Sequence, residues 1–553
     1  MADTKISDLA AITGANTAAD DDFIIVDKSA AQSKRITRDE LKSVIGISDL
    51  NDLSDALTNS SGVTIGIGTD ALANDNGTAN QNTAIGYKAG EAITSGSGNF
   101  FGGYKAGLNA TIATNSIAIG NLASGLGVLT GNDNTAIGFL AGYDLTTGTY
   151  NNFIGYRAGV NATTADNTIA IGQNAISAGV LTGTDNTAIG RLAGNDLTNG
   201  TYNFFGGHLA GANATTASNN IAIGREAIGA GVLTGANNVA LGYQAGYDLT
   251  SGSHNILSGL QAGANVTTGT GNVFQNNGAG ANATTASYTV AIGYEAIGTG
   301  VLTGADNIVI GRQAGQDLTS GIYNFFGGFR AGYNATAADS NIAIGRNAIG
   351  LGVLTGESNV AVGRSAGYDL TSGDFNVIVG YVAGANVTTG SDNTICGTSA
   401  GFSLTTGSNN TIIGHGASPS SASVSNQITL GNTSIATIRA QVTSITALSD
   451  RRDKKDIKEL PVGLDFINSL NPVEFTWNMR DGAKVGQKEA GFIAQELDEA
   501  QQNAGVEELM NLVLKTNPDR LEAAPGKLIP VLVRAIQELS AEVKSLKLCK
   551  CNT

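Results

Sequence analysis

The sequence predicts a mainly β protein, with a shaft built as a parallel β-roll or β-helix solenoid and a small α/β domain that ends in a coiled-coil helix. Three observations predict it. A glycine-containing motif recurs every 17 or 18 residues from Asn82 to Gly414. Residues 450–553 hold 15 of the 31 Lys and Arg, whereas residues 82–414 hold only nine. The last segment carries apolar residues at heptad spacing.

The repeated motif is Asn-x-Ala-Ile-Gly or a close variant, and its glycine marks each unit of the repeat. Asn276 stands where one member is missing, and a fainter copy ends at Gly68. The units form super-repeats of 52 residues, which share a GVLTG segment and an Asp-Leu-Thr segment. The ladder glycines are Gly86, Gly103, Gly120, Gly138, Gly155, Gly172, Gly190, Gly207, Gly224, Gly242, Gly259, Gly293, Gly311, Gly328, Gly345, Gly363, Gly380, Gly397 and Gly414.

Each unit reads as β structure because its apolar run is short and is flanked by Asn, Gly, Thr and Ser. A helix would need about ten or more residues of 3.6-residue periodicity without the glycines. One unit fits one solenoid coil of two short strands and two turns, with equivalent residues stacked in ladders. We expect the ladder glycine to have positive φ or to fill a crowded internal corner, and Cys396 to be a buried thiol.

Composition excludes several classes of protein. The 76 glycines come with only six prolines, so the chain is not collagen-like. A 41% hydrophobic and 14% charged composition does not fit disorder, and a net charge of −15 argues against a nucleic-acid partner. The first residues lack a basic segment followed by an apolar run, and no stretch approaches ~18 apolar residues. We therefore expect neither a secretory signal nor membrane insertion.

Few side chains suggest a metal or cofactor site. His208, His254 and His415 are scattered, without ligands at metal-binding spacing, so we expect no metal and no cofactor. A row of aspartates recurs once per super-repeat and has two interpretations, cation binding or, as we favour, capping of Asx turns. These residues are Asp144, Asp196, Asp248, Asp317 and Asp369.

The repeat also carries a resemblance. Segments such as NTAIGFLAG at 134–142 resemble the left-handed parallel β-roll in the heads of trimeric autotransporter adhesins, and similar repeats occur in phage fibres. The adhesin units are shorter, so the handedness of the solenoid stays open.

The C-terminal region carries a second resemblance, in three ordered blocks at 449–478, 491–497 and 527–546. They resemble the intramolecular chaperone domain of endosialidase-type tailspikes, a self-cleaving peptidase family. The opening Ser-Asp-x-Arg-x-Lys motif is read as Ser449, Asp450, Arg452 and Lys454. The resemblance implies that Ser449 attacks the carbonyl of Leu448 with Lys454 as base, which releases residues 449–553.

The residue types fit that chemistry. A serine hydroxyl is a weak nucleophile until a base removes its proton. Lysine acts as such a base when its ammonium is desolvated or placed among other cations, which lowers its pKa. Arg451, Arg452 and Lys455 supply neighbouring cations around Lys454.

The last segment has apolar residues stepping by 3 and 4, which predicts a coiled-coil seam. The mixture of Ile, Leu and Val does not choose between two and three strands, and the homotrimer is implied by the family resemblance. Phe475 and Trp477 are expected in the chaperone core. The seam residues are Ile529, Leu532, Ile536, Leu539, Val543 and Leu546.

The N-terminal segment predicts a hairpin, with strands at Phe23 and near Arg35, and then a short helix that Thr37 and Glu40 open with a capping box. It resembles the start of several tail fibres, where that end attaches to the virion. The expected domains are an attachment cap at 1–46, a linker helix or short coil at 47–61, the shaft at 62–418, a β neck at 419–448 and the chaperone at 449–553.

Together these features predict a structural tail-fibre protein of a bacteriophage, assembled as a homotrimer in the host cytoplasm. Its N-terminus would attach to a virion or baseplate protein, and its shaft would bind a host-surface glycan or protein. Single-turnover self-cleavage is the one enzymatic activity expected. Two alternatives stay open: a depolymerase tailspike that acts on host glycan, and a collar or whisker protein without a receptor.

Overall fold

The computed structural model describes residues 22–27, 32–37, 56–58, 64–76, 80–435, 437–439, 449–480, 482 and 484–551. The chain divides into two units, Met1–Tyr323 and Asn324–Thr553. The first unit begins with β1 (Asp22–Asp27) and β2 (Gln32–Thr37), which pair antiparallel and confirm the expected hairpin. The helix predicted after Thr37 lies outside the described residues. Within the predicted linker, β3 (Ala56–Thr58) is a strand that pairs antiparallel with β4, and not a helix or coil.

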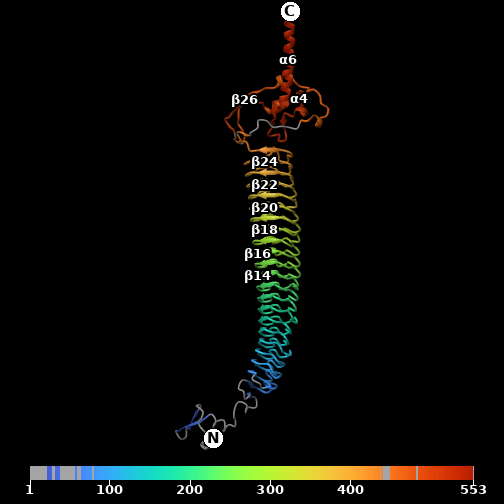
Figure 1. The fold of residues 1–553 in the computed structure, drawn as a ribbon. Helices are drawn as coiled ribbons and strands as arrows, with labels where there is room; N and C mark the ends of the chain where they lie inside the picture. Colours follow the sequence, from blue (N-terminus) through green and yellow to red (C-terminus); the bar gives the residue numbers. More distant parts are fainter. Residues whose placement is uncertain are drawn as a thin grey trace. The chain divides into compact units, whose positions relative to one another are not determined.

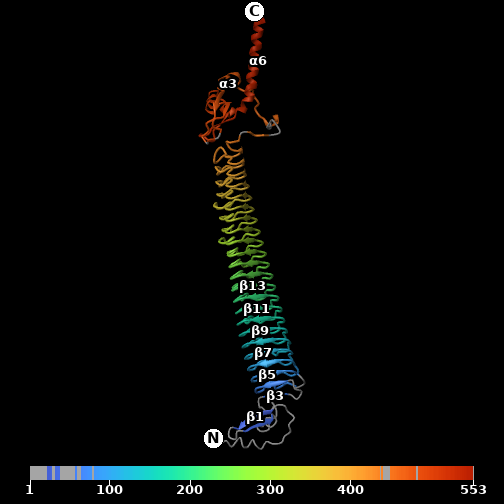
Figure 2. The ribbon, with the colours of Figure 1, turned by 90° about the vertical axis from the view of Figure 1, so that its left-hand side faces the viewer.

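The rest of the first unit is a stack of three-residue strands, each paired in parallel with its neighbour in sequence. Figures 1 and 2 show this stack in two views. The strands are β4 (Ile65–Ile67), β5 (Thr83–Ile85), β6 (Phe100–Gly102), β7 (Ile117–Ile119), β8 (Thr135–Ile137), β9 (Asn152–Ile154), β10 (Ile169–Ile171), β11 (Thr187–Ile189), β12 (Phe204–Gly206), β13 (Ile221–Ile223), β14 (Val239–Leu241), β15 (Ile256–Ser258), β16 (Val273–Gln275), β17 (Val290–Ile292) and β18 (Ile308–Ile310).

The predicted mainly β, parallel solenoid is confirmed, with one correction. We expected two short strands in each coil, but the described coils each carry one. Left-handed residues such as Arg157 (φ 55°) and Asn167 (φ 54°) interrupt the remainder of the coil. Coils still bond to each other there, because Thr146 N donates to the carbonyl oxygen of Thr163 at 2.9 Å.

The ladder glycine has the conformation and the crowding that the sequence predicts. Gly155 has φ 137°, and a Cβ on it would lie 2.6 Å from the carbonyl oxygen of Gly172. Only a glycine allows the two coils to approach so closely. Asn276 takes the missing position with φ 98°, and Gly68 continues the ladder at its start, with φ 123°.

The asparagine of the motif forms a second ladder inside the coil. Asn151 is buried, and its Nδ2 donates to Asn134 Oδ1 at 3.0 Å and to the carbonyl oxygen of Ala165 at 2.7 Å. Its own Oδ1 accepts from the backbone N–H of Thr168 at 3.0 Å. The buried amide therefore has its partners, which is the condition for a polar group in a core.

The super-repeat has a packing cause. Phe101, Phe153 and Phe205 are fully buried and lie 52 residues apart. Ala136 and Ala170 occupy the positions that pair with Phe153 on either side. In these coils one large side chain thus fills the space that two alanines leave, whereas further along the chain Leu257 and Phe274 pair directly.

The second unit begins with further parallel rungs. They are β19 (Phe325–Gly327), β20 (Ile342–Ile344), β21 (Val360–Val362), β22 (Val377–Val379), β23 (Thr394–Cys396), β24 (Thr411–Ile413) and β25 (Ile428–Leu430). The ladder thus runs into the range predicted as a neck, of which 436 and 440–448 lie outside the described residues.

The expected burial of Cys396 is wrong. In each three-residue strand the middle side chain faces inward and the outer two face solvent, as in β23, where Ile395 is buried. Cys396 is the third residue of β23, so its thiol is exposed.

The C-terminal part of the second unit is a small α/β domain. Its buried core consists of Phe466, Leu497, Val506, Met510, Leu512, Val513, Leu528 and Val531. Trp477 and Phe475 lie outside this core and are half-buried, with ring centroids 5.1 Å apart, which corrects the expectation for them. Its elements are the 3₁₀ helix η3 (Arg451–Asp453), α3 (Leu464–Ser469), β26 (Val473–Thr476), β27 (Lys488–Gly491), α4 (Ala494–Asn503), α5 (Glu507–Met510), β28 (Val513–Leu514), β29 (Glu522–Ala523), the 3₁₀ helix η4 (Pro525–Leu528) and α6 (Ile529–Cys551).

Candidate functional site

A short turn at the start of the α/β domain holds the Ser-Asp-x-Arg-x-Lys motif. Asp450 caps η3, because its Oδ1 accepts from the backbone N–H of Arg452 at 2.8 Å. The Arg452 guanidinium also bonds to both carboxylate oxygens, with Nη2 2.6 Å from Oδ2 and Nε 3.1 Å from Oδ1. These bonds hold the pKa of Asp450 below its usual value, with the Arg452 side chain as the largest cause. The carboxylate therefore stays ionised and keeps the turn closed.

The closed turn brings the predicted nucleophile and base together. Lys454 follows η3, and its Nζ donates to Ser449 Oγ at 2.6 Å. That distance is within the reach that a nucleophile and its general base require. Both residues are exposed in the single chain, so desolvation of the ammonium would have to come from other chains. Leu448 lies outside the described residues, and the catalytic roles of Ser449 and Lys454 stay predictions.

Helix α6 has two different apolar faces. Val531 and Ala535 are buried, and Val531 belongs to the core of the domain. All the predicted seam residues, by contrast, are exposed in the single chain, as Ile536 is at 65%. A row of large apolar side chains left in solvent marks an interaction surface.

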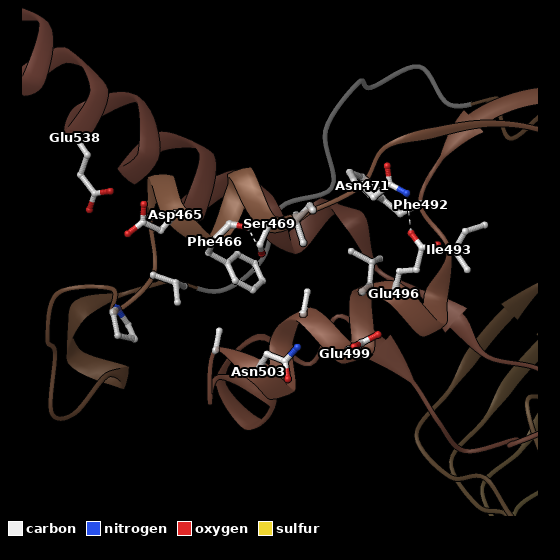
Figure 3. A pocket seen from close by; sticks show the side chains of 17 residues that line it. Asp465, Phe466, Ser469, Asn471, Phe492, Ile493, Glu496, Glu499, Asn503 and Glu538 are labelled. Carbon is white, nitrogen blue, oxygen red and sulfur yellow. Dashed lines mark hydrogen bonds between the residues drawn. The ribbon is translucent and has the colours of Figure 1, made fainter.

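A groove of about 740 Å³ lies among α3, α4 and α6 (Figure 3). Its walls are apolar at Phe466 and Leu497, and Glu496 and Glu499 add carboxylates. Ser469 also lines it, but its Oγ donates to the backbone carbonyl of Phe466 at 2.7 Å. That hydroxyl is therefore engaged by the backbone of its own helix.

Glu538, at one end of the groove, ties α6 to α3. Its carboxylate accepts from the backbone N–H of Leu464 at 2.7 Å and from Arg534 Nε at 2.8 Å. These bonds, the one to Leu464 first, hold the pKa of Glu538 below its usual value. A Cβ on Gly463 would collide with this carboxylate, so the glycine belongs to the joint.

The histidines and the aspartate row are the remaining candidate sites. His208 is half-buried, and His254 and His415 are exposed. Across the part of the chain that the structure describes, no three His, Cys, Asp or Glu residues are grouped so as to hold a metal ion. Burial raises the pKa of Asp144 and of Asp369. Among the described helices, none has the length and apolarity needed to cross a bilayer.

Sequence reasoning missed two structural devices. The buried asparagine ladder was visible as the first residue of most copies of the motif, with Ser116, Thr168 and Thr289 as exceptions, but asparagine beside glycine was interpreted as a turn former. The bond from Leu464 to Glu538 joins residues 74 apart in sequence, and the one local signal for it is the i,i+4 pair of Arg534 and Glu538.

Comparison with known proteins identifies the domain that carries the motif. The family model described as chaperone of endosialidase matches residues 449–506. No curated protein matches the chain, and no solved structure matches it. A C-terminal chaperone of endosialidase behind a long parallel β-solenoid fits a phage tail fibre or tailspike.

Proposed function

We propose that this protein is a phage tail fibre that binds the host surface through its shaft, and whose C-terminal domain assembles three chains and then cuts itself off before Ser449. The observation that carries the self-cleavage is the 2.6 Å bond from Lys454 Nζ to Ser449 Oγ, within the segment matched by the chaperone family. The protein would be a virion component assembled in the host cytoplasm, attached through its N-terminus to a virion or baseplate protein.

The cleavage proceeds in two balanced steps. Lys454 removes the hydroxyl proton of Ser449 as Oγ attacks the carbonyl carbon of Leu448. The peptide C–N bond breaks, and the proton passes to the departing amine of Ser449, which leaves an ester between Leu448 and Ser449 Oγ. Water then hydrolyses the ester. The products are a shaft with a carboxylate at Leu448 and a chaperone with a free amine and hydroxyl at Ser449.

Two unpartnered apolar surfaces support a homotrimer. The first is the seam of α6, with Ile536 and Leu546 both 65% exposed. The second is the outer face of the strands, where pairs such as Ile221 and Ile223 on β13 stay exposed. Three chains that share these faces remove them from water, which is the main driving force of association.

Assembly before cleavage has a physical logic. Parallel β pairing between distant residues is slow and exposes edges that misassemble. A helix bundle at the C-terminus gathers three chains and sets their register before the shafts pair. Cleavage afterwards removes the helix bundle that nucleated the trimer, so an unfolded shaft cannot readily refold. The stability of the shaft is then set by its rate of unfolding.

The test of cleavage is a denaturing gel with intact mass measurement. Wild-type protein should yield two fragments, one ending at Leu448 and one beginning at Ser449, whereas Ser449→Ala and Lys454→Ala should stay full length. Lys458→Ala is the matched control, since Lys458 is an exposed lysine of the same segment that lies outside the motif and its neighbouring cations, and it should cleave. Wild-type protein that runs at full length, or a Ser449→Ala variant that still cleaves, contradicts the proposal.

A further inference from the structure

Every basic residue of the repeat lies at one corner of the coil. Residues 82–414 contain nine Lys and Arg, and each stands one or two positions after a ladder glycine. We call these two positions of every coil the cationic corner. Its basic members are Lys88, Lys105, Arg157, Arg191, Arg225, Arg312, Arg330, Arg346 and Arg364.

Backbone bonds stack the corner from coil to coil. In the first unit, Arg157 N donates to the carbonyl oxygen of Phe139 at 2.8 Å. In the second unit, Ser365 N donates to the carbonyl oxygen of Arg346 at 2.9 Å. The corner residues of neighbouring coils therefore lie over each other, about 4.8 Å apart.

Aromatic rings occupy the same column as the cations. In the first unit, Tyr87 stacks on Tyr104 with ring centroids 5.5 Å apart. In the second unit, the Arg364 guanidinium lies 5.5 Å from the ring centroid of Tyr381. Such rings attract a neighbouring cation through their faces and give the corner apolar surface beside its charges.

Most acidic residues stand outside the two corner positions, although Glu91 reaches Lys88 and pairs with it at 2.9 Å. Of the sixteen Asp and Glu in residues 82–414, all but two stand five or six positions before or after a ladder glycine. The exceptions are Glu226 and Glu295, and Glu226 pairs with Arg225 at 3.1 Å. Arg157, Arg191, Arg346 and Arg364 are exposed. Within each unit, a chain with a net charge of −15 thus presents accessible cations on one edge of its coils.

From this arrangement we infer that the cationic corner binds an anionic polysaccharide of the host surface, an inference that rests on the receptor-binding role proposed above. Guanidinium groups bind carboxylates through paired, charge-assisted hydrogen bonds. A site repeated along a ladder matches a polymer that repeats its own charge, so weak contacts add up through multivalency. A folded protein ligand would call for one unique patch, whereas this corner recurs over many coils.

The test replaces Arg157, Arg191, Arg346 and Arg364 with Gln and measures retention on immobilised polygalacturonate, with neutral dextran in parallel. The matched control has Asn199→Asp, Ser251→Asp, Ser320→Asp and Ser372→Asp, four exposed positions nine residues after a ladder glycine. Both variants change the net charge by the same amount. We expect wild type and control to be retained on polygalacturonate but not on dextran, and to be released by salt. The quadruple Gln variant should bind polygalacturonate at least about tenfold more weakly, a loss of ~1.4 kcal/mol or more.

Three results would overturn the inference. The Gln variant could be retained on polygalacturonate as well as wild type is, wild type could fail to be retained on polygalacturonate, or wild type could be retained on dextran as strongly as on polygalacturonate. A second arm applies the same three labelled proteins to a panel of bacterial strains. If wild type and the Gln variant bind a strain equally, receptor binding stands and the cationic corner is not its site. If wild type binds no strain but polygalacturonate retains it as expected, the corner binds anionic glycan and the receptor-binding role is the part that fails.

Discussion

Lys454 Nζ lies 2.6 Å from Ser449 Oγ across a single 3₁₀ turn. The turn itself is closed by the carboxylate of Asp450 and the guanidinium of Arg452. Under the proposed mechanism the motif separates two tasks, since one pair of residues would supply nucleophile and base while the other pair fixes the distance between them. This division makes the role of Arg452 testable without touching the reacting groups.

Replacing Arg452 with Ala should slow cleavage roughly 10- to 100-fold, because a loosened turn lets Ser449 and Lys454 drift apart. The measurement is the appearance of the shaft fragment over time on a denaturing gel, with a native gel to follow assembly. Arg451→Ala is the control, because Arg451 is an exposed arginine in the same turn. Equal rates for both variants would show that Arg452 does not position the pair.

Replacing Gly155 with Ala should destabilise the shaft by ~2 kcal/mol or more, since the new Cβ meets the carbonyl oxygen of Gly172 and φ 137° is strained for alanine. Thermal unfolding followed by circular dichroism measures the change. Gly526→Ala serves as the control, because no atom lies within 4 Å of a Cβ built there. An unchanged shaft transition in Gly155→Ala would argue against direct stacking of these coils.

Replacing Asn151 with Ala should cost ~2–4 kcal/mol, because it leaves the Ala165 carbonyl and the Thr168 N–H without their partner in the core. Asn134 Oδ1 loses one of its two donors and keeps the backbone N–H of residue 151. Denaturant unfolding measures this loss. The exposed Asn199, changed to Ala, should have little effect. A comparable loss in the free energy of unfolding for the two variants would mean that the buried asparagine ladder does not stabilise the shaft more than a surface asparagine does.

Glu538 predicts a pH dependence of the chaperone domain. Its pKa is held below the usual 4.5 by Leu464 N–H and Arg534, so its stabilisation is fully present above that value and is lost as the pH falls through the lower pKa of the folded state. In a Ser449→Ala background, Glu538→Gln should melt at a lower temperature at pH 7, and the difference should shrink below about pH 4.

The readout for Glu538 is fluorescence of Trp477, the single tryptophan of the chain, which reports on the chaperone domain. Glu542→Gln removes a carboxylate from the exposed surface of the same helix and should change little. A melting difference that is independent of pH would disprove the electrostatic explanation.

Sequence alone reached the solenoid because its period is carried by residues with narrow conformational roles. Gly155 has to be glycine, and its recurrence fixes the coil length. The direction in which each side chain points was harder to predict. In β23 the neighbours Ile395 and Cys396 are both apolar, so sequence does not show that Ile395 points inward and Cys396 outward. The turn of Ser449 and Lys454 came from resemblance, and spacing alone would not have distinguished it from a solvated basic loop.

The misses share a physical cause, which is that they depend on contacts between distant residues. Trp477 was expected in the core from its size, but its hairpin leaves it half-buried, with Nε1 donating to Glu489 at 2.6 Å. The cationic corner emerges only when the repeat is aligned coil by coil, since its nine cations are spread over residues 88–364.

Native mass spectrometry of the purified product tests the central claim most directly, because it reports assembly and cleavage together. The account predicts a trimer of residues 1–448 from the wild-type chain, and an uncleaved monomer from Ile536→Asn, which disrupts the seam; Gln537→Asn, on the exposed surface beside it, should still give the trimer. A processed shaft that is monomeric, or a trimer that forms equally well with Ile536→Asn, would contradict it.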